Sequence, residues 1–320
     1  MMKKILFIYL LLLSAKFAVA QEPKVTANIN FTGTIGTYPI EMQFNLVHKS
    51  DSISGEYYYS KSGSANKIFV NGTFKKENLI LDERSYVNKK KQYVSSGYFI
   101  ISAAQKMTVS GTWGKNKAEA MKADALKVTL VCKEDLNVFD PLKFKYTVTK
   151  KKASYADISQ AASSYYALQS FTIENNKGKV QTLTRFKEDD LVDKVPEIIL
   201  EDMNFDGYLD LKIMINYPDM SKGDYSYLYY IYDKKQEKFI RNSVLDGIGV
   251  AYFDPTINAV FTYDADGSGN EGTKTYKWQN GKLYLIKEER VYEDDVFVHY
   301  KEYKIVNGKS VEVKSYKKKE

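Results

Sequence analysis

The sequence predicts an all-β protein. An N-terminal antiparallel meander forms a small barrel or sandwich, and a C-terminal antiparallel β domain follows that is a sandwich or propeller-like. Two observations predict this class. Five β-rich segments between residues 25 and 131 repeat one glycine motif, and the C-terminal half places Asn-Gly turns between β-rich runs. We expect at most one or two short helices.

The glycine motif predicts strong curvature in the N-terminal half. In each copy an apolar or small residue stands two positions before the glycine and a large apolar residue two positions after it, and these three positions share one face of a strand. A glycine there lets a sheet bend sharply or another backbone approach. We therefore expect one curved meander, with chance recurrence as the alternative. The copies are centred on Gly33, Gly55, Gly72, Gly97 and Gly111.

Two hairpins are predicted near the C-terminus, because Asn-Gly tolerates the positive φ angles of a type I′ turn. Their turns are Asn280-Gly281 and Asn307-Gly308, and the paired runs are 273–279 with 283–292 and 296–306 with 310–316.

Residues 153–170 are the best helix candidate, because Ile158, Ala161, Ala162 and Tyr165 lie on one stripe. The stretch 165–173 fits a strand equally well, paired with 180–186 through a turn at 175–178. Both interpretations remain open at this stage.

The first twenty residues predict export. A charged start, an apolar run and Ala18-Val19-Ala20 form a signal peptide with cleavage near Ala20-Gln21. Lys16 interrupts the apolar run, so we expect no transmembrane anchor in the mature chain and a periplasmic or extracellular location. Cleavage removes three lysines and no acid, so the net charge falls from +7 to +4 over 300 residues. This weak charge argues against nucleic acid as a partner.

We expect four segments: the signal peptide at 1–20, an N-terminal β domain at 21–131, a linker at 132–150 and a C-terminal β domain at 151–320. The linker is predicted from the Asp, Asn and Pro residues between 133 and 143. The single cysteine, Cys132, cannot form an internal disulfide. Its apolar neighbours predict a buried strand position and not a nucleophile.

One loop predicts a calcium site. Counting from Asp202, oxygen-bearing side chains stand at positions 1, 3, 5 and 9, and a glycine stands at position 6, as in an EF-hand loop. Position 12 is Ile213 where a bidentate glutamate belongs, so we expect a strand-loop-strand variant. Glu201, or a residue of the loop from Asp219 to Asp224, could supply a further ligand. The predicted Ca²⁺ ligands are Asp202, Asn204, Asp206, the Tyr208 carbonyl and Asp210.

A second acidic loop spans residues 264–272 and matches only half of this pattern. It is a surface hairpin, a weak second metal site or a recognition loop, because glycine-rich connections on β scaffolds often carry contacts. Its candidate partner-binding residues are Asp264, Asp266, Ser268, Asn270 and Glu271.

Residues 165–290 resemble a family of bacterial periplasmic calcium-loop proteins. The resemblance rests on the loop from Asp202 to Leu211, on the tyrosine-rich run 225–232 and on the segment 276–283. The family includes an immunity protein that inhibits a peptidoglycan-cleaving toxin delivered by a type IV secretion system. The loop also resembles those of FG-GAP repeats. The resemblance implies a propeller-like or sandwich fold, structural calcium and a lysozyme-inhibitor-like role.

A binding module is the function that the sequence favours. Only His48 and His299 are present, and no catalytic triad, zinc motif or phosphate loop is recognisable, so we predict no enzyme. Paired carboxylates could still hydrolyse glycosides. The predicted partner is a peptidoglycan hydrolase or a cell-wall glycan, because the 27 tyrosines offer amphipathic contact surface. A surface-bound structural scaffold is the alternative, and we expect a monomer.

Overall fold

The computed structural model describes residues 21–75, 77–87, 92–102, 107–153, 165–217 and 224–319. The all-β prediction is confirmed. The helices in this part of the chain are two short ones, α2 (Lys117–Ala120) and α3 (Ser243–Ile248), with one 3₁₀ turn at Pro141–Lys143. The signal peptide at 1–20 lies outside the described residues, and no described helix is long and apolar enough to cross a membrane.

The chain divides into two compact units. The first contains residues 143–197 and 215–225 with the N-terminal residues up to Pro23, and the second contains residues 24–142, 198–214 and 226–320. The division passes through strands β14 (Asp210–Tyr217) and β15 (Asp224–Asp233). The linker expected at 132–150 stays a prediction.

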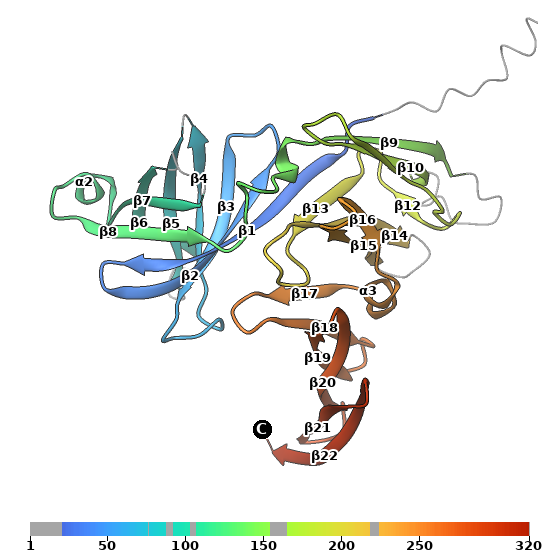
Figure 1. Ribbon diagram of the computed structural model, residues 1–320. Coiled ribbons are helices and arrows are strands. Elements are labelled where there is room, and N and C mark those ends of the chain that lie inside the picture. Colours follow the sequence, from blue (N-terminus) through green and yellow to red (C-terminus); the bar gives the residue numbers. More distant parts are fainter. Residues whose placement is uncertain are drawn as a thin grey trace, which may run out of the picture. The chain divides into compact units, whose positions relative to one another are not determined.

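The N-terminal part of the second unit is an eight-stranded antiparallel barrel (Figure 1). Each strand pairs with the next along the chain, and β1 also pairs with β8, which closes the barrel. Its strands are β1 (Lys24–Ile35), β2 (Tyr38–Val47), β3 (Ser52–Tyr59), β4 (Ile68–Lys75), β5 (Asn78–Val87), β6 (Gln92–Ser102), β7 (Thr108–Gly114) and β8 (Leu126–Cys132).

Four of the motif glycines, at positions 33, 55, 72 and 111, are positions of close backbone approach. A Cβ atom at Gly33 would lie 2.0 Å from the Thr129 carbonyl oxygen, and one at Gly72 would lie 1.9 Å from the Ile80 oxygen. Such distances exclude any side chain, so these glycines let neighbouring strands cross closely. The predicted curved meander is therefore confirmed, and it closes as a barrel.

The barrel interior holds a buried polar group. Glu83 accepts hydrogen bonds from the Tyr57 hydroxyl (2.6 Å), the Trp113 indole (2.9 Å) and the Ser96 hydroxyl (2.8 Å). Burial, then the nearby Glu83 charge, raises the pKa of Tyr57, so its hydroxyl stays protonated and donates. Gly97 leaves the space in which the Trp113 and Glu83 side chains meet. A carboxylate with this many donors is stably accommodated in an apolar core.

Two antiparallel groups complete the second unit. The first contains β13 (Glu197–Glu201), which pairs with β14, and β16 (Lys238–Arg241), which pairs with β15. The second is a six-stranded sheet, in which the strands follow their order in the chain. That sheet consists of β17 (Ala251–Asp254), β18 (Ala259–Ala265), β19 (Glu271–Gln279), β20 (Lys282–Val291), β21 (Phe297–Val306) and β22 (Lys309–Lys319).

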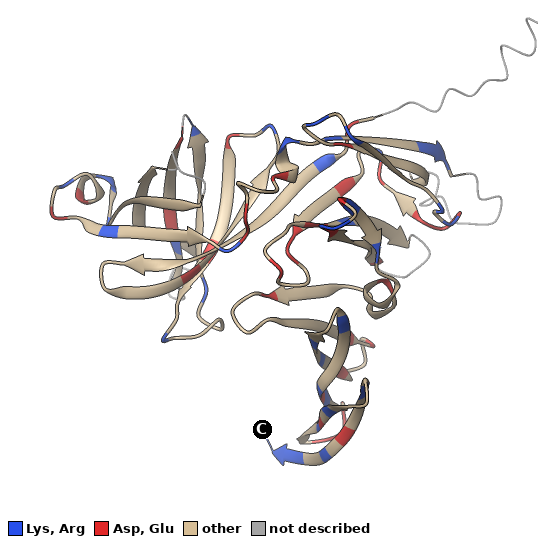
Figure 2. Ribbon diagram, viewed as in Figure 1, with Lys and Arg blue, Asp and Glu red and all other residues tan. Residues whose placement is uncertain are grey.

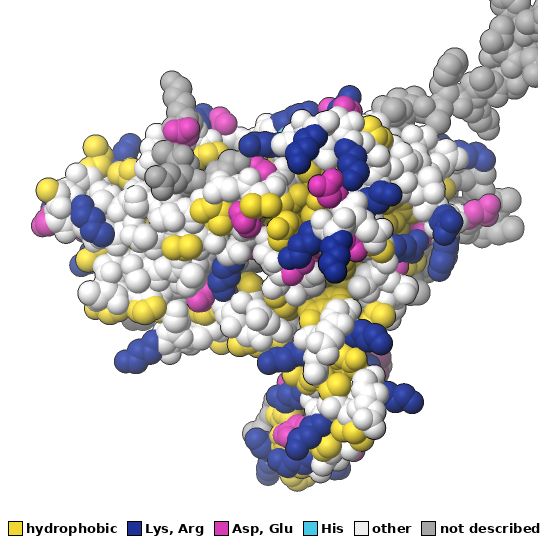
Figure 3. All heavy atoms as spheres, in the orientation of Figure 1, with side chains coloured by type: hydrophobic (Ala, Val, Ile, Leu, Met, Phe, Trp, Pro, Cys, Tyr) yellow, Lys and Arg dark blue, Asp and Glu magenta, His cyan; other side chains and the backbone are white. Residues whose placement is uncertain are grey.

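Both predicted Asn-Gly hairpins are present in this sheet. Gln279 pairs with Lys282, and Val306 pairs with Lys309, with positive φ at both turn residues in each case. The last strand is exposed along most of its length, and lysines mark its end in Figure 2. Basic, acidic and hydrophobic side chains intermingle over the C-terminal strands on the face in Figure 3.

The first unit is a small sheet of β9 (Lys145–Lys152), β10 (Tyr166–Glu174), β11 (Val180–Leu183) and β12 (Leu191–Val192). The prediction of a helix at 153–170 is wrong from Tyr166 onward, where the chain forms β10. Residues 154–164 lie outside the described part. The strand interpretation holds, because β10 buries Leu168, Phe171 and Ile173 and pairs with β11. Between these two strands, Asn175 accepts backbone hydrogen bonds within its turn.

Candidate functional site

The acidic loop joins β13 to β14, directly after the Glu201–Asp210 strand pair. The strand-loop-strand arrangement expected from Ile213 is present, because Ile213 lies within β14. The loop turns twice through left-handed backbone, with φ of 61° at Phe205 and 83° at Gly207. Glycine at the sixth position therefore permits the tight turn that the calcium-loop pattern requires.

The carboxylate at the first loop position organises the turn. Asp202 accepts hydrogen bonds from the backbone N–H groups of Asp206 (3.1 Å) and Gly207 (2.8 Å). Asn204 accepts from the Asp206 N–H (3.2 Å), and Asp206 accepts from the Tyr208 N–H (3.0 Å). The oxygen-bearing side chains thus hold the turn by accepting hydrogen bonds from the backbone N–H groups of the loop itself.

The carboxylate at the ninth position fastens the loop to its surroundings. Asp210 is fully buried and accepts from the backbone N–H groups of Met203 (2.9 Å) and Tyr232 (2.7 Å). The Trp278 indole donates to the Met203 carbonyl (2.8 Å), and the Asp135 N–H donates to the Gly207 carbonyl (2.8 Å). The loop is therefore held by β15, by β19 and by the segment that follows the barrel.

Burial raises the pKa of two carboxylates of the loop, Asp202 and Asp210. Desolvation raises the pKa of Asp202 to about 7, and the charges of Asp206 and Glu134 act in the same direction. Desolvation also raises the pKa of Asp210 well above its ordinary value, with the Asp202 charge as a further cause. A bound cation would offset both effects, because it favours the ionised carboxylates.

The donor chemistry of the loop fits calcium, but the side chains are not gathered around one point. Within the described ranges, no three Asp, Glu, His or Cys side chains come together in a group that could hold a metal ion. Asp202 and Asp210 are buried, whereas Asp206 is exposed.

The further ligand expected from Glu201 is engaged elsewhere. Its carboxylate accepts from the Lys212 ammonium (2.6 Å) and from the Asn28 amide (3.1 Å). Of the other suggested source, the loop from Asp219 to Asp224, residues 219–223 lie outside the described part of the chain, and Asp224 is exposed at the start of β15.

The second acidic loop is the exposed connection between β18 and β19. Asp266 accepts from the backbone N–H groups of Ser268 (2.8 Å) and Asn270 (3.3 Å), and Asp264 forms an ion pair with Arg290 (2.8 Å). Ser268 and Glu271 are exposed, and Asn270 is partly buried and accepts from the Glu293 N–H (3.2 Å). The loop is thus an ordered hairpin tip.

A polar pocket was not foreseen from the sequence. It has a volume of about 410 Å³ and lies within the second unit, between β1–β3 of the barrel and the turn that joins β17 to β18. Its floor contains the buried Glu201–Lys212 ion pair. The available signal was that Glu201 and Lys212 each stand beside apolar residues of a strand, and such a signal does not reveal that the two residues meet.

The chain shows little similarity to known proteins. No protein-family model matches the chain, and no curated protein is similar to it. One solved structure, described as a Xanthomonas type IV secretion system related protein, is similar at 20% sequence identity and a TM-score of 0.42. The match covers 54% of this chain and 90% of that protein. At this level the similarity carries no argument about function.

Proposed function

We propose that the protein is an exported binding protein whose acidic loop holds a structural calcium ion. The hydrogen-bond pattern of Asp202 is the observation that carries this proposal. This first-position carboxylate accepts from the fifth and sixth N–H groups of the loop, and Gly207 makes the turn at the sixth position. This tight turn, with glycine at its sixth position, supports a loop that wraps a cation.

The ion would be held by Asp202, Asn204, Asp206, Asp210 and the Tyr208 carbonyl. Hard oxygen donors of this kind suit calcium better than a transition metal. Calcium would offset the repulsion among three carboxylates, two of which are buried. Because the loop contacts β15 and β19, the ion would stabilise the packing of those strands as well as its own turn.

Thermal unfolding of the mature chain tests this proposal. Millimolar calcium should raise the melting temperature of the chelated protein, because a ligand that prefers the folded state stabilises it. Magnesium should raise it less, because it demands a stricter octahedral shell. Asp206→Ala should abolish the calcium response, whereas Asp294→Ala, an equal change of charge on an exposed residue, should retain it. A response that survives in Asp206→Ala would refute the site.

Inhibition of a peptidoglycan hydrolase is a second candidate, favoured by the hairpin tip at residues 264–272. The tip is exposed, and it is ordered by the Asp266 hydrogen bonds and the Asp264–Arg290 ion pair. A narrow, preorganised tip can enter an enzyme cleft at low entropic cost. Ser268→Arg should weaken inhibition of a lysozyme-type enzyme by about 2 kcal/mol or more in a cell-wall turbidity assay. An unchanged inhibition constant would place the interface elsewhere.

A further inference from the structure

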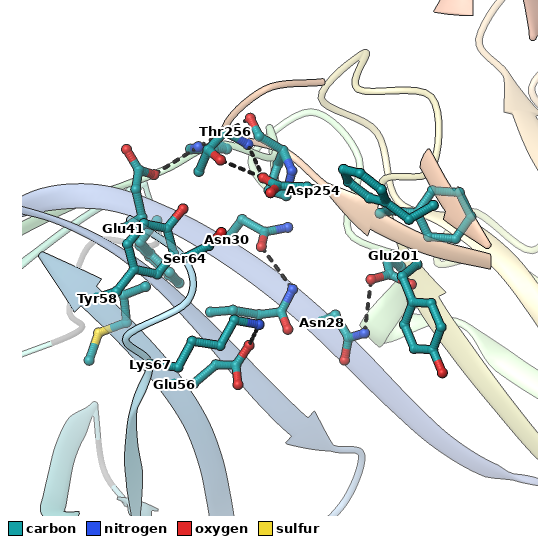
Figure 4. Close-up of a pocket in the computed structure, with 18 of the residues that line it drawn as sticks. Asn28, Asn30, Glu41, Glu56, Tyr58, Ser64, Lys67, Glu201, Asp254 and Thr256 are labelled. Carbon is teal, nitrogen blue, oxygen red and sulfur yellow. Dashed lines mark hydrogen bonds and ion pairs between the residues drawn. The ribbon is translucent and has the colours of Figure 1, made fainter. Parts of the chain in front are cut away.

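We propose that the polar pocket of the second unit binds a neutral carbohydrate. The proposal extends the binding role proposed above to a defined ligand class and does not depend on calcium. The pocket is large enough for sugar residues, because ligand sites commonly enclose about 300 to 1,000 Å³. Figure 4 shows the side chains of Asn28, Glu201, Tyr58 and Asp254 around it, which come from three separate parts of the second unit.

Three of the four acids in the pocket are paired with lysines. Four acids and three lysines line it. Lys212 pairs with Glu201 (2.6 Å), Lys133 pairs with Glu41 (2.9 Å), and Lys67 pairs with Glu56. The fourth acid, Asp254, accepts from the Thr256 N–H (2.9 Å). An anionic ligand would have to break one of these pairs to gain a counter-ion, so the pocket favours a ligand without negative charge.

Planar polar groups give the pocket the hydrogen-bonding capacity that sugar hydroxyls need. Asn28 donates to Glu201 (3.1 Å), and Gln43 donates to Asn30 (3.0 Å). A side-chain amide has two donor hydrogens and two acceptor lone pairs, so one such bond leaves capacity for a ligand. Neighbouring hydroxyls of a pyranose match amide and carboxylate groups that are fixed in this way.

Aromatic side chains supply the apolar part of the site. Tyr252 lines the pocket and is 59% exposed, whereas Phe253 beside it is buried and Phe261 is partly buried. An exposed ring at a rim offers a rigid face to the C–H side of a pyranose. Tyr58 lines the opposite, barrel side and is half-buried. Polar and aromatic residues therefore line one space.

The ion pairs favour binding over hydrolysis. A carboxylate-based glycosidase needs one carboxyl group that stays protonated to donate to the leaving group. Glu41, Glu56 and Glu201 each form an ion pair with a lysine ammonium, so their carboxylates are already engaged as acceptors. We therefore assign the pocket to recognition.

The test titrates the mature chain with three neutral trisaccharides: triacetylchitotriose, cellotriose and maltotriose. At least one should bind with a dissociation constant of about 1 mM or tighter. Tyr252→Ala should weaken that binding about fivefold, because a stacked ring contributes on the order of 1 kcal/mol and tenfold corresponds to about 1.4 kcal/mol. Tyr252→Phe keeps the ring and should retain binding. Tyr263→Ala, an equally exposed tyrosine on β18 outside the pocket, should also retain it.

Three results would overturn the proposal. They are no binding of any of the three sugars, binding that Tyr252→Ala leaves unchanged, and tighter binding of a trigalacturonate than of every neutral sugar. Repeating the titration in chelator separates this site from the calcium loop. Sugar binding that persists in chelator supports the pocket whether or not calcium binds.

Discussion

The Trp278 indole donates a 2.8 Å hydrogen bond to the carbonyl oxygen of Met203, and this bond joins the six-stranded sheet to the acidic loop. The two residues are 75 positions apart in the chain. Met203 is fully buried in a cluster that also contains Tyr229 and Leu245, and the Trp278 ring packs against that cluster. The conformation of the loop is therefore coupled to the packing of β19.

Replacing Trp278 by phenylalanine should destabilise the protein and weaken calcium binding. The substitution leaves an aromatic ring but removes the donor, so the Met203 carbonyl loses its partner. The expected loss is about 1 to 3 kcal/mol in the free energy of unfolding, measured by urea denaturation. Unchanged stability together with unchanged calcium affinity would contradict the coupling.

Replacing Gly72 by alanine should be strongly destabilising. The added Cβ would lie 1.9 Å from the Ile80 carbonyl oxygen, so β4 and β5 would have to separate. Overpacking of this kind costs about 3 kcal/mol. Gly247→Ala is the matched control, because a Cβ there meets nothing within 4 Å and the residue lies in α3. The control should be neutral or slightly stabilising. Equal losses of unfolding free energy for the two substitutions, measured by urea denaturation, would show that the barrel does not need a glycine at position 72.

Removing Lys212 should lower the free energy of unfolding, because it leaves a buried charge without a partner. Both Lys212 and Glu201 are less than a tenth exposed, and their charged atoms are 2.6 Å apart. Lys212→Met leaves the Glu201 carboxylate without its cation, so we expect a loss of about 3 to 5 kcal/mol in unfolding free energy. The double variant with Glu201→Gln should recover much of that loss. A double variant no more stable than Lys212→Met would mean that the pair is not the cause.

Cys132 should resist alkylation in the folded protein. It is 5% exposed at the end of β8. Burial, with the neighbouring Glu134 charge, raises the pKa of its thiol well above the ordinary value, so the reactive thiolate is scarce at neutral pH. Mass spectrometry after iodoacetamide treatment should find Cys132 modified in denaturant and unmodified without it. Rapid modification of the folded chain would contradict its buried placement.

The sequence predicts the parts of this fold that are encoded locally. The glycine spacing around Gly33 and Gly72 indicates the barrel, because each copy fixes a close approach within neighbouring strands. Asn280-Gly281 indicates a hairpin by its backbone preference alone. The prediction of a helix at 153–170 failed because the apolar residues of this segment fit both a helical and a strand periodicity. The pairing of β10 with β11 shows that the chain is a strand from Tyr166 onward.

Contacts between distant residues could not be predicted in this way. The spacing from Asp202 to Asp210 indicates a cation loop, but nothing in it shows that Asp210 bonds the N–H of Tyr232. The polar pocket depends on Asn28, Glu201 and the turn after β17, which only the folded chain brings together. Strand pairing, and not local propensity, creates that site.

Calorimetric titration of calcium into the chelated mature chain tests the central claim most directly. We expect one calcium ion per chain, loss of that binding in Asp206→Ala, and retention in Asp266→Ala, which alters only the hairpin tip. Affinity in the range of about 10⁻⁴ to 10⁻³ M is expected for an extracellular loop that lacks a bidentate glutamate. Absence of heat at millimolar calcium, or a binding isotherm that Asp206→Ala leaves unaltered, would contradict the account.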